Sequence, residues 1–97
     1  MKAVFIAFDQ AYYEQILTIL NYAHIKGFTR WDEVQGRGSK TGEPHFGTHA
    51  WPSLNSSILT VIDDAKVKPL LNELKVLDAT SDLMGLRAFV WNVEDGI

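Results

Sequence analysis

The sequence predicts an α+β domain in which two helices cover one face of a four-stranded antiparallel sheet. A strand, a helix and a strand follow one another twice along the chain. The chain has 97 residues, which is too few for two hydrophobic cores. Apolar residues make up 46% and charged residues 22% of it, as in globular domains. No apolar run reaches the ~20 residues that a bilayer span requires. We therefore expect one domain over residues 1–97.

A change in apolar spacing predicts the first strand and the first helix. Residues 3–8 are a continuous apolar run, as in a strand buried on both faces. Over residues 10–26 apolar positions recur every three or four residues, which indicates a helix with Asp9 as N-cap and Gly27 as left-handed C-terminal residue. His24 lies late in this helix, where a cation complements the helix dipole.

The chain then enters a second strand and a long loop. Residues 28–35 contain the strand-forming types Thr29, Trp31 and Val34. Residues 36–55 hold four of the seven Gly, two of the three Pro and two of the three His, which is the composition of a loop. Structureless loops longer than about 12 to 15 residues are usually functional or disordered.

The second half of the chain repeats the pattern of the first. Residues 56–62 return to strand character, and Asp63 and Asp64 follow where a helix cap and first turn favour acids. Leucines at helical spacing predict a helix of about three turns, with Pro69 within or just after its first turn. Capping also explains the two neighbouring carboxylates better than catalysis does.

A loop at residues 78–85 and a strand at 87–93 complete the order βαββαβ, which is that of the ferredoxin-like fold. In this fold both helices lie on one face, so the other face of the sheet needs a cover. Trp31, Phe89 and Trp91 on the strands could provide it by packing against copies of the chain. We therefore expect a homo-oligomer.

Charge and cysteine content exclude several classes of function. The chain has 9 Lys and Arg against 12 Asp and Glu, a net charge of −3, which disfavours nucleic-acid binding. It has no Cys, so disulfides, thiolate metal sites and cysteine nucleophiles are excluded. Asp9 and Glu14 interrupt the N-terminal region where a signal peptide would be apolar, so we expect a cytoplasmic protein.

Four motifs together resemble the PII signal-transduction superfamily nearly end to end. They are GFT at 27–29, EVQGRG at 33–38, VIDD at 61–64, and Gly85 followed by FVWNVE at 89–94. The resemblance implies a trimer whose long loop, the T-loop at residues 36–55, docks onto partner proteins. It also implies effector clefts between subunits, lined here by Thr29, Gly36, Arg37, Gly38 and Arg87.

The chain departs from the nucleotide-binding members of that family in two places. Residues 79–85 are acidic where those proteins have a basic, glycine-rich loop, and no basic tail follows the last strand. Arg37 and Arg87 alone would neutralise only part of the negative charge of a triphosphate, so ordinary adenine-nucleotide sensing is not expected. The sequence is more similar to small, divergent PII-like proteins, some of which are encoded with heavy-metal efflux systems.

The T-loop contains a candidate metal site. Imidazole is a common ligand of Zn, Cu, Ni and Co, and His45 and His49 are spaced to converge, with Glu43 nearby. Three subunits could together fill a coordination shell. The alternative is that both are ordinary surface histidines, with His49 hydrogen-bonded to backbone.

The same loop contains aromatic residues that suggest a partner contact. Trp51 could anchor a partner protein, since Trp is enriched at interface hot spots, and Phe46 is a second candidate contact. Trp51 could instead fold back over the sheet of the trimer, with Pro52 fixing the turn.

These observations favour a non-enzymatic PII-like trimer that senses a small effector, such as a transition-metal ion at the T-loop, and signals to a partner such as a metal-efflux transporter. An alternative effector is an adenine nucleotide or other anion in the intersubunit cleft. No nucleophile elbow or catalytic triad is evident. A dimeric α+β-barrel enzyme, with an apolar pocket over the open sheet, and a ligand-free interaction module stay open as alternatives of other classes.

Overall fold

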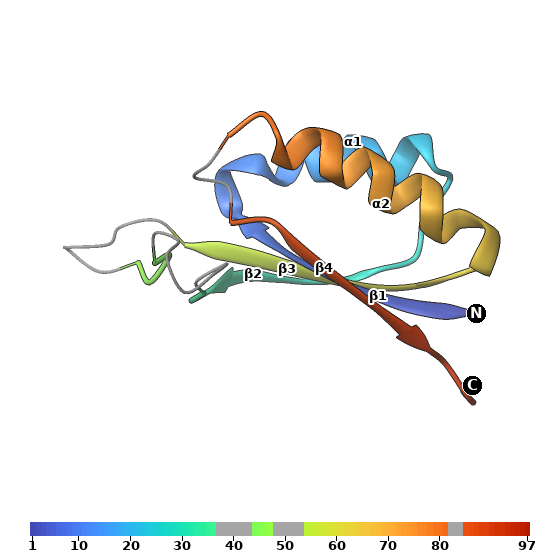
Figure 1. Ribbon diagram of the computed structural model, residues 1–97. Helices are drawn as coiled ribbons and strands as arrows, with labels where there is room; N and C mark the ends of the chain where they lie inside the picture. The colour runs from blue at the N-terminus through green and yellow to red at the C-terminus, as the bar shows by residue number, and fades with distance from the viewer. Residues whose placement is uncertain (37–43, 48–53, 82–84) are drawn as a thin grey trace.

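The computed structural model describes residues 1–36, 44–47, 54–81 and 85–97. Two helices lie side by side on one face of a single four-stranded sheet (Figure 1). This architecture confirms the predicted α+β, ferredoxin-like fold. The elements are β1 (Lys2–Asp9), the 3₁₀ turn η1 (Gln10–Tyr12), α1 (Tyr13–Tyr22), β2 (Thr29–Val34), β3 (Asn55–Ile62), α2 (Asp64–Asp78) and β4 (Arg87–Asn92).

The strands run in the order β2-β3-β1-β4, and every neighbouring pair is antiparallel. β1 and β3 are therefore central, while β2 and β4 are the two edges. The central position of β1 explains its continuous apolar sequence, because its residues face the helices and the opposite side of the sheet in turn.

The core lies between the sheet and the helices. Val4, Ile6 and Phe8 project from alternate positions of β1 and are fully buried. They belong to one cluster with Ile16 of α1 and Leu70 of α2, so the apolar stripe of each helix packs on the same face of the sheet.

No helix of the described chain covers the other face of the sheet. Trp31, Phe89 and Trp91 are 46 to 60% exposed. Strand register places Phe89 opposite Phe5, and Trp91 opposite Ala3, on this uncovered face. A monomer would leave these aromatic rings in water, where their burial against another chain would be favourable.

The first helix ends earlier than the sequence predicts. α1 stops at Tyr22 instead of continuing to residue 26, and His24 takes the left-handed conformation, with φ 56°, that the sequence predicts for Gly27. The reason lies in Ile25, which is buried in the core while its amide donates to the carbonyl of Leu20. Burying Ile25 requires the chain to turn at His24. The predicted position of His24 inside the helix is therefore wrong, because it follows the C-cap residue Ala23, and its helix-dipole role stays a prediction.

The two predicted N-caps differ. The predicted N-cap role of Asp9 is confirmed, because its Oδ1 accepts a hydrogen bond from the amide of Ala11 at 2.9 Å at the start of η1. Asp63 occupies the N-cap position of α2 but makes no side-chain capping bond. Beside it, the N-terminal amine of Met1 hydrogen-bonds the Asp64 carboxylate and lowers its pKa.

The second helix is longer than the three turns that the sequence predicts. α2 has 15 residues, and Pro69 is its sixth, just after the first turn as expected. Among the described helices none is long and apolar enough to cross a membrane.

The conformation of His24 leads to a stability prediction. Replacing His24 with Gly should stabilise the fold by roughly 0.5 to 1 kcal/mol, because a left-handed backbone is strained for any residue with a Cβ. His24→Ala keeps the Cβ and serves as the control. Urea unfolding at one fixed protein concentration measures the difference. Equal stability of the two variants would show that the backbone at residue 24 carries no strain.

Candidate functional site

The side chain of His45 lies where the loop ends of all four strands meet. It contacts Asn55, the first residue of β3, and approaches Asp9, the last residue of β1. Its backbone pairs with Gly36, two residues after β2, and its ring faces Gly85, two residues before β4. His45 is 2% exposed, so this residue of the long loop is part of the protein interior.

One short hydrogen bond holds the ring in place. Nδ1 of His45 lies 2.6 Å from Oδ1 of Asn55. Because an amide oxygen only accepts, Nδ1 carries the proton and donates it. The carboxylate Oδ2 of Asp9 lies 3.7 Å from the same nitrogen, while its Oδ1 caps η1. The ring is therefore held between β3 and the start of the first helical segment.

Two glycines make room for this arrangement. A Cβ on Gly36 would lie 2.3 Å from the Asn55 amide nitrogen, and a Cβ on Gly85 would lie 3.2 Å from Cε1 of His45. Gly85 also has φ +60°, which favours glycine. Gly36, two residues after β2, and Gly85, two residues before β4, thus leave room for the Asn55 amide and the His45 ring.

The described backbone at the base of the long loop is a short ladder. Gly36 and His45 exchange two backbone hydrogen bonds of 3.0 and 2.6 Å. Phe46 forms a bridge with Leu54, and the side chain of Gln35 donates to the Phe46 carbonyl at 2.9 Å. Phe46, predicted to contact a partner, is half-buried in this ladder.

The structure brings some predicted cleft residues together and keeps others apart. Gly36 and Gly85 both approach the His45 site, and Gly85 leads into Arg87, whose side chain is exposed. Thr29 is also exposed but begins β2, at the far edge of the sheet from β4. With strands roughly 4.8 Å apart, the three spacings between β2 and β4 amount to roughly 14 Å. One chain alone therefore does not unite Thr29 with Arg87.

The remaining predicted site residues lie outside the described residues, and they comprise Arg37, Gly38, Glu43, His49 and Trp51.

The structure does not support the metal prediction for His45. The Nδ1 atom donates its proton to Asn55, and the residue is neither the exposed ligand nor the ordinary surface histidine that the sequence suggests. Within residues 1–36, 44–47, 54–81 and 85–97, no group of three or more His, Asp or Glu side chains could hold a metal ion.

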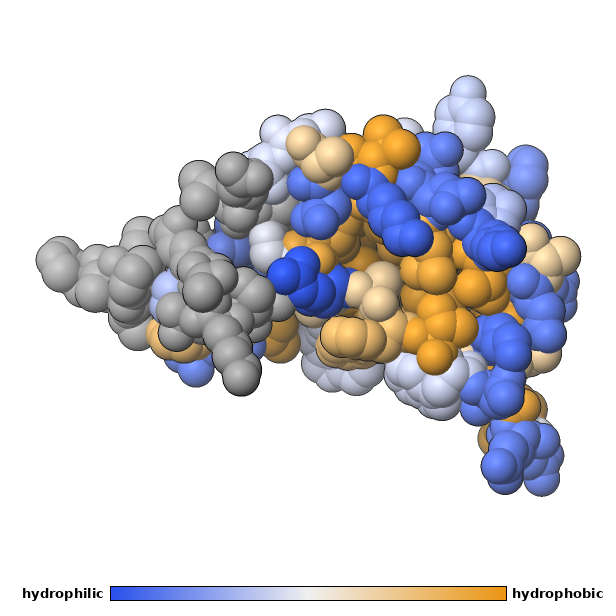
Figure 2. Space-filling view, viewed as in Figure 1, coloured by the Kyte–Doolittle hydropathy of each residue, from blue (hydrophilic) through white to orange (hydrophobic). Residues whose placement is uncertain are grey.

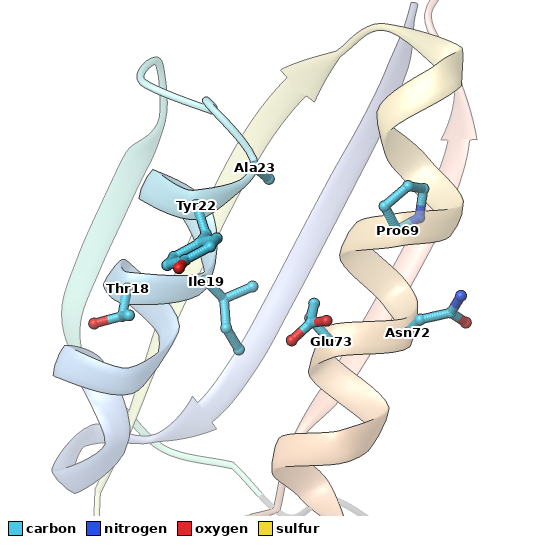
Figure 3. A pocket seen from close by; sticks show the side chains of 7 residues that line it. All are labelled: Thr18, Ile19, Tyr22, Ala23, Pro69, Asn72 and Glu73. Atoms are coloured by element: carbon cyan, nitrogen blue, oxygen red, sulfur yellow. The ribbon is translucent and has the colours of Figure 1, made fainter.

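Among the hollows elsewhere on the described part of the chain, two bear on binding and assembly. A groove of about 570 Å³ runs between α1 and α2, where Ile19, Tyr22, Pro69 and Glu73 line it (Figure 3). None of the predicted site residues lies in this groove, so it is separate from the His45 end of the fold.

The second hollow lies at the edge of the sheet. Figure 2 shows apolar surface gathered on the side where α2 meets β4. Leu71 and Leu74 of α2, together with Leu86 and Ala88, line a shallow cleft of about 160 Å³ there. Uncovered apolar surface therefore extends along β4, on its edge as well as on the open face of the sheet.

Sequence reasoning misses three residues of the His45 cluster. It identifies Asp9 only as a cap, Asn55 only as the end of the loop, and Gly85 only as part of a motif. A buried histidine with an amide partner has no signature in residue spacing, because the partners come from separate strands. Gly36 and Gly85, each two residues from the end of a strand, are the available signal.

Comparison with known proteins gives a consistent result. The model of the nitrogen regulatory protein P-II family matches residues 1–97. No curated protein sequence matches this chain.

Several solved structures share the fold. The PII-like protein CPII from Thiomonas intermedia K12, bound to ADP, AMP and bicarbonate, superimposes with a TM-score of 0.76 at 21% identity, over 93% of this chain and 82% of its own. Its apo form gives 0.71 at 19% identity, over 93% and 85%. A PII-like signalling protein from Thermus thermophilus gives 0.67 at 18% identity, over 95% and 85%.

The packing around His45 leads to a prediction for the glycines. Gly85→Ala should destabilise the fold by about 1 to 3 kcal/mol, since the new Cβ meets the imidazole in a backbone conformation strained for alanine. Gly27→Ala is the matched control, because nothing lies within 4 Å of its Cβ position. Thermal unfolding of both variants measures the difference. Equal loss in the two proteins would contradict the packing described here.

Proposed function

Because the chain belongs to the nitrogen regulatory protein P-II family, we propose that it is a trimeric regulatory protein that senses a small anion bound between neighbouring chains. One chain would contribute Gly36, Arg37, Gly38 and Arg87 to the cleft, and its neighbour would contribute Thr29. Binding would change the T-loop at residues 36–55, which would act on a partner protein.

The observation that carries this proposal is the separation of Thr29 from Arg87. Both side chains are exposed, and they lie on opposite edges of the sheet. Gly36 and Arg87, in contrast, both belong to the end of the fold that packs around His45. A ligand that touches Thr29 and Arg87 at the same time would need a second copy of the chain.

The apolar surface along β4 supports assembly of identical chains. Phe89 and Trp91 are exposed on the open face, and Leu86 and Ala88 line the cleft at the edge. Burying such surface contributes about 25 cal/mol per Å² of apolar area. The helix groove, lined by Tyr22 and Glu73, is on the other side of the sheet and would stay accessible.

Charge favours an effector with few negative charges. Residues 79–85 contain Asp82 and no Lys or Arg, so Arg37 and Arg87 are the cations that the cleft would offer. Two guanidinium groups match a mononucleotide phosphate or bicarbonate better than a triphosphate. CPII from Thiomonas intermedia, which shares the fold, was solved with ADP, AMP and bicarbonate, which supports testing these anions first.

A regulatory output requires that the anion distinguish two states of the protein. Only a difference in affinity between two conformations of the loop can shift their populations. Gly36 is the described residue that joins the cleft to the loop, and it is bound to His45 by two backbone hydrogen bonds, so a shift of this pair is a direct route for such a difference.

The proposed trimer is tested by placing a charged residue on the open face of the sheet and measuring the mass of the assembly by sedimentation. Wild type should sediment at three times the 10.9 kDa chain mass. Phe89→Glu should sediment as a single chain, because burying an unpaired carboxylate in the interface is costly. Val76→Glu on the outer face of α2 is the control, since Val76 is exposed to a similar extent and should leave the trimer intact. A monomeric wild type, or a trimeric Phe89→Glu protein, would contradict the proposal.

The effector site is tested by calorimetric titration with AMP, ADP, ATP and sodium bicarbonate, against sodium chloride. We expect AMP or bicarbonate to bind, and Arg87→Ala to weaken that binding about tenfold or more, as for a lost hydrogen bond to a charged group. Lys68→Ala removes an exposed cation from α2 and should change nothing. No saturable binding of any anion to wild type, or equal binding by Arg87→Ala, would overturn the anion proposal.

A further inference from the structure

His45 links segments that the proposed cleft would use. Gly36, on the loop side, is joined to the His45 backbone by two hydrogen bonds. Gly85, on the β4 side, packs against the His45 ring and lies two residues before Arg87. A shift of His45 would therefore move both of these segments relative to each other.

The ring itself has little freedom to move. It is buried, and its Nδ1 proton is donated to Asn55 at 2.6 Å. Removing the acceptor of a buried donor raises the free energy of the folded state, because no water replaces the missing bond. Asn55 in turn pairs with Asp9, so the ring is attached to the two central strands of the sheet.

A side chain required only for stability would not need this connectivity. An apolar residue of similar size could fill the same interior volume without a buried polar pair. His45 instead combines a polar anchor on β3 with contacts to the two segments that flank the cleft. Its geometry is that of a residue that fixes their relative position.

We propose that His45 is a positioning residue for the effector cleft: its hydrogen bond to Asn55 holds Gly36 in register with the segment from Gly85 to Arg87. This inference rests on the proposed anion-sensing function. The residue itself would not touch the anion. It would set the distance between the backbone at Gly36 and the guanidinium of Arg87, and so the affinity for the anion.

Two replacements of His45 that are nearly isosteric with each other separate the effect of the hydrogen bond from that of packing. His45→Asn places an amide nitrogen at the same number of bonds from the backbone as Nδ1, so it can still donate to Asn55. His45→Leu puts a methyl group there. Both variants lose the same ring contact with Gly85, so a difference between them reports the hydrogen bond.

The measurements are calorimetric titration with AMP and with sodium bicarbonate, and hydrogen exchange at the amides of Gly36 and His45. We expect His45→Leu to bind about tenfold or more weakly than His45→Asn, as for a lost buried hydrogen bond, and both to bind more weakly than wild type because both lose the ring contact with Gly85. Amide exchange at Gly36 should be faster in His45→Leu than in His45→Asn. Thermal unfolding checks that both remain folded.

The outcomes distinguish the two proposals. If wild type binds the anions and both variants bind equally well, the positioning role fails while the anion-sensing function stands. If wild type binds none of them, the proposed function fails, and the exchange rates at Gly36 still decide whether the hydrogen bond holds the loop base. Equal exchange in the two variants overturns the positioning role in either case.

A second pair of variants covers the case in which His45→Leu does not fold. Asn55→Asp retains an oxygen acceptor for Nδ1, whereas Asn55→Leu removes it. The same order of affinities and of Gly36 exchange rates is expected. Indistinguishable behaviour of Asn55→Asp and Asn55→Leu would overturn the proposal.

Discussion

The imidazole of His45 is buried where the loop ends of the four strands meet, and a buried ring nitrogen that carries a proton needs an acceptor. Asn55 supplies the acceptor from β3. The glycines at 36 and 85 leave space for the amide and the ring. The positions of these segments thus follow from one requirement, that a polar group taken out of water be satisfied.

The opposite constraint acts on the face of the sheet that the helices leave open. Phe89 and Trp91 carry large apolar area into solvent. The edge of β4 adds an apolar cleft beside α2, on the side where Figure 2 shows apolar surface. The interior of one chain is complete at the helix side but incomplete on this face. The proposed regulatory site between chains is compatible with this, because Phe89 and Trp91 lie on the same strand as Arg87.

Much of the fold could be predicted, because strand and helix periodicities are local properties of the chain. The strands, the helices, the Asp9 cap and the place of Pro69 are all evident in the spacing of residues. The end of α1 is not, because Ile25 is drawn into a core that neighbouring residues do not reveal. The candidate site could be predicted only in part. Gly36 lies beside the His45 cluster, and its role in a cleft stays a prediction. The sequence suggests a metal-binding or surface His45, whereas the structure buries it.

The sequence by itself determined the βαββαβ order and the family, since apolar period, glycine placement and motif order are all written along the chain. Only the tertiary structure decided that His45 is an interior residue bonded to Asn55, and that Thr29 and Arg87 lie on opposite edges of the sheet. The physical reason is the same in both cases. Burial and distance depend on how strands far apart in sequence pair with one another, and strand pairing is a property of the folded sheet.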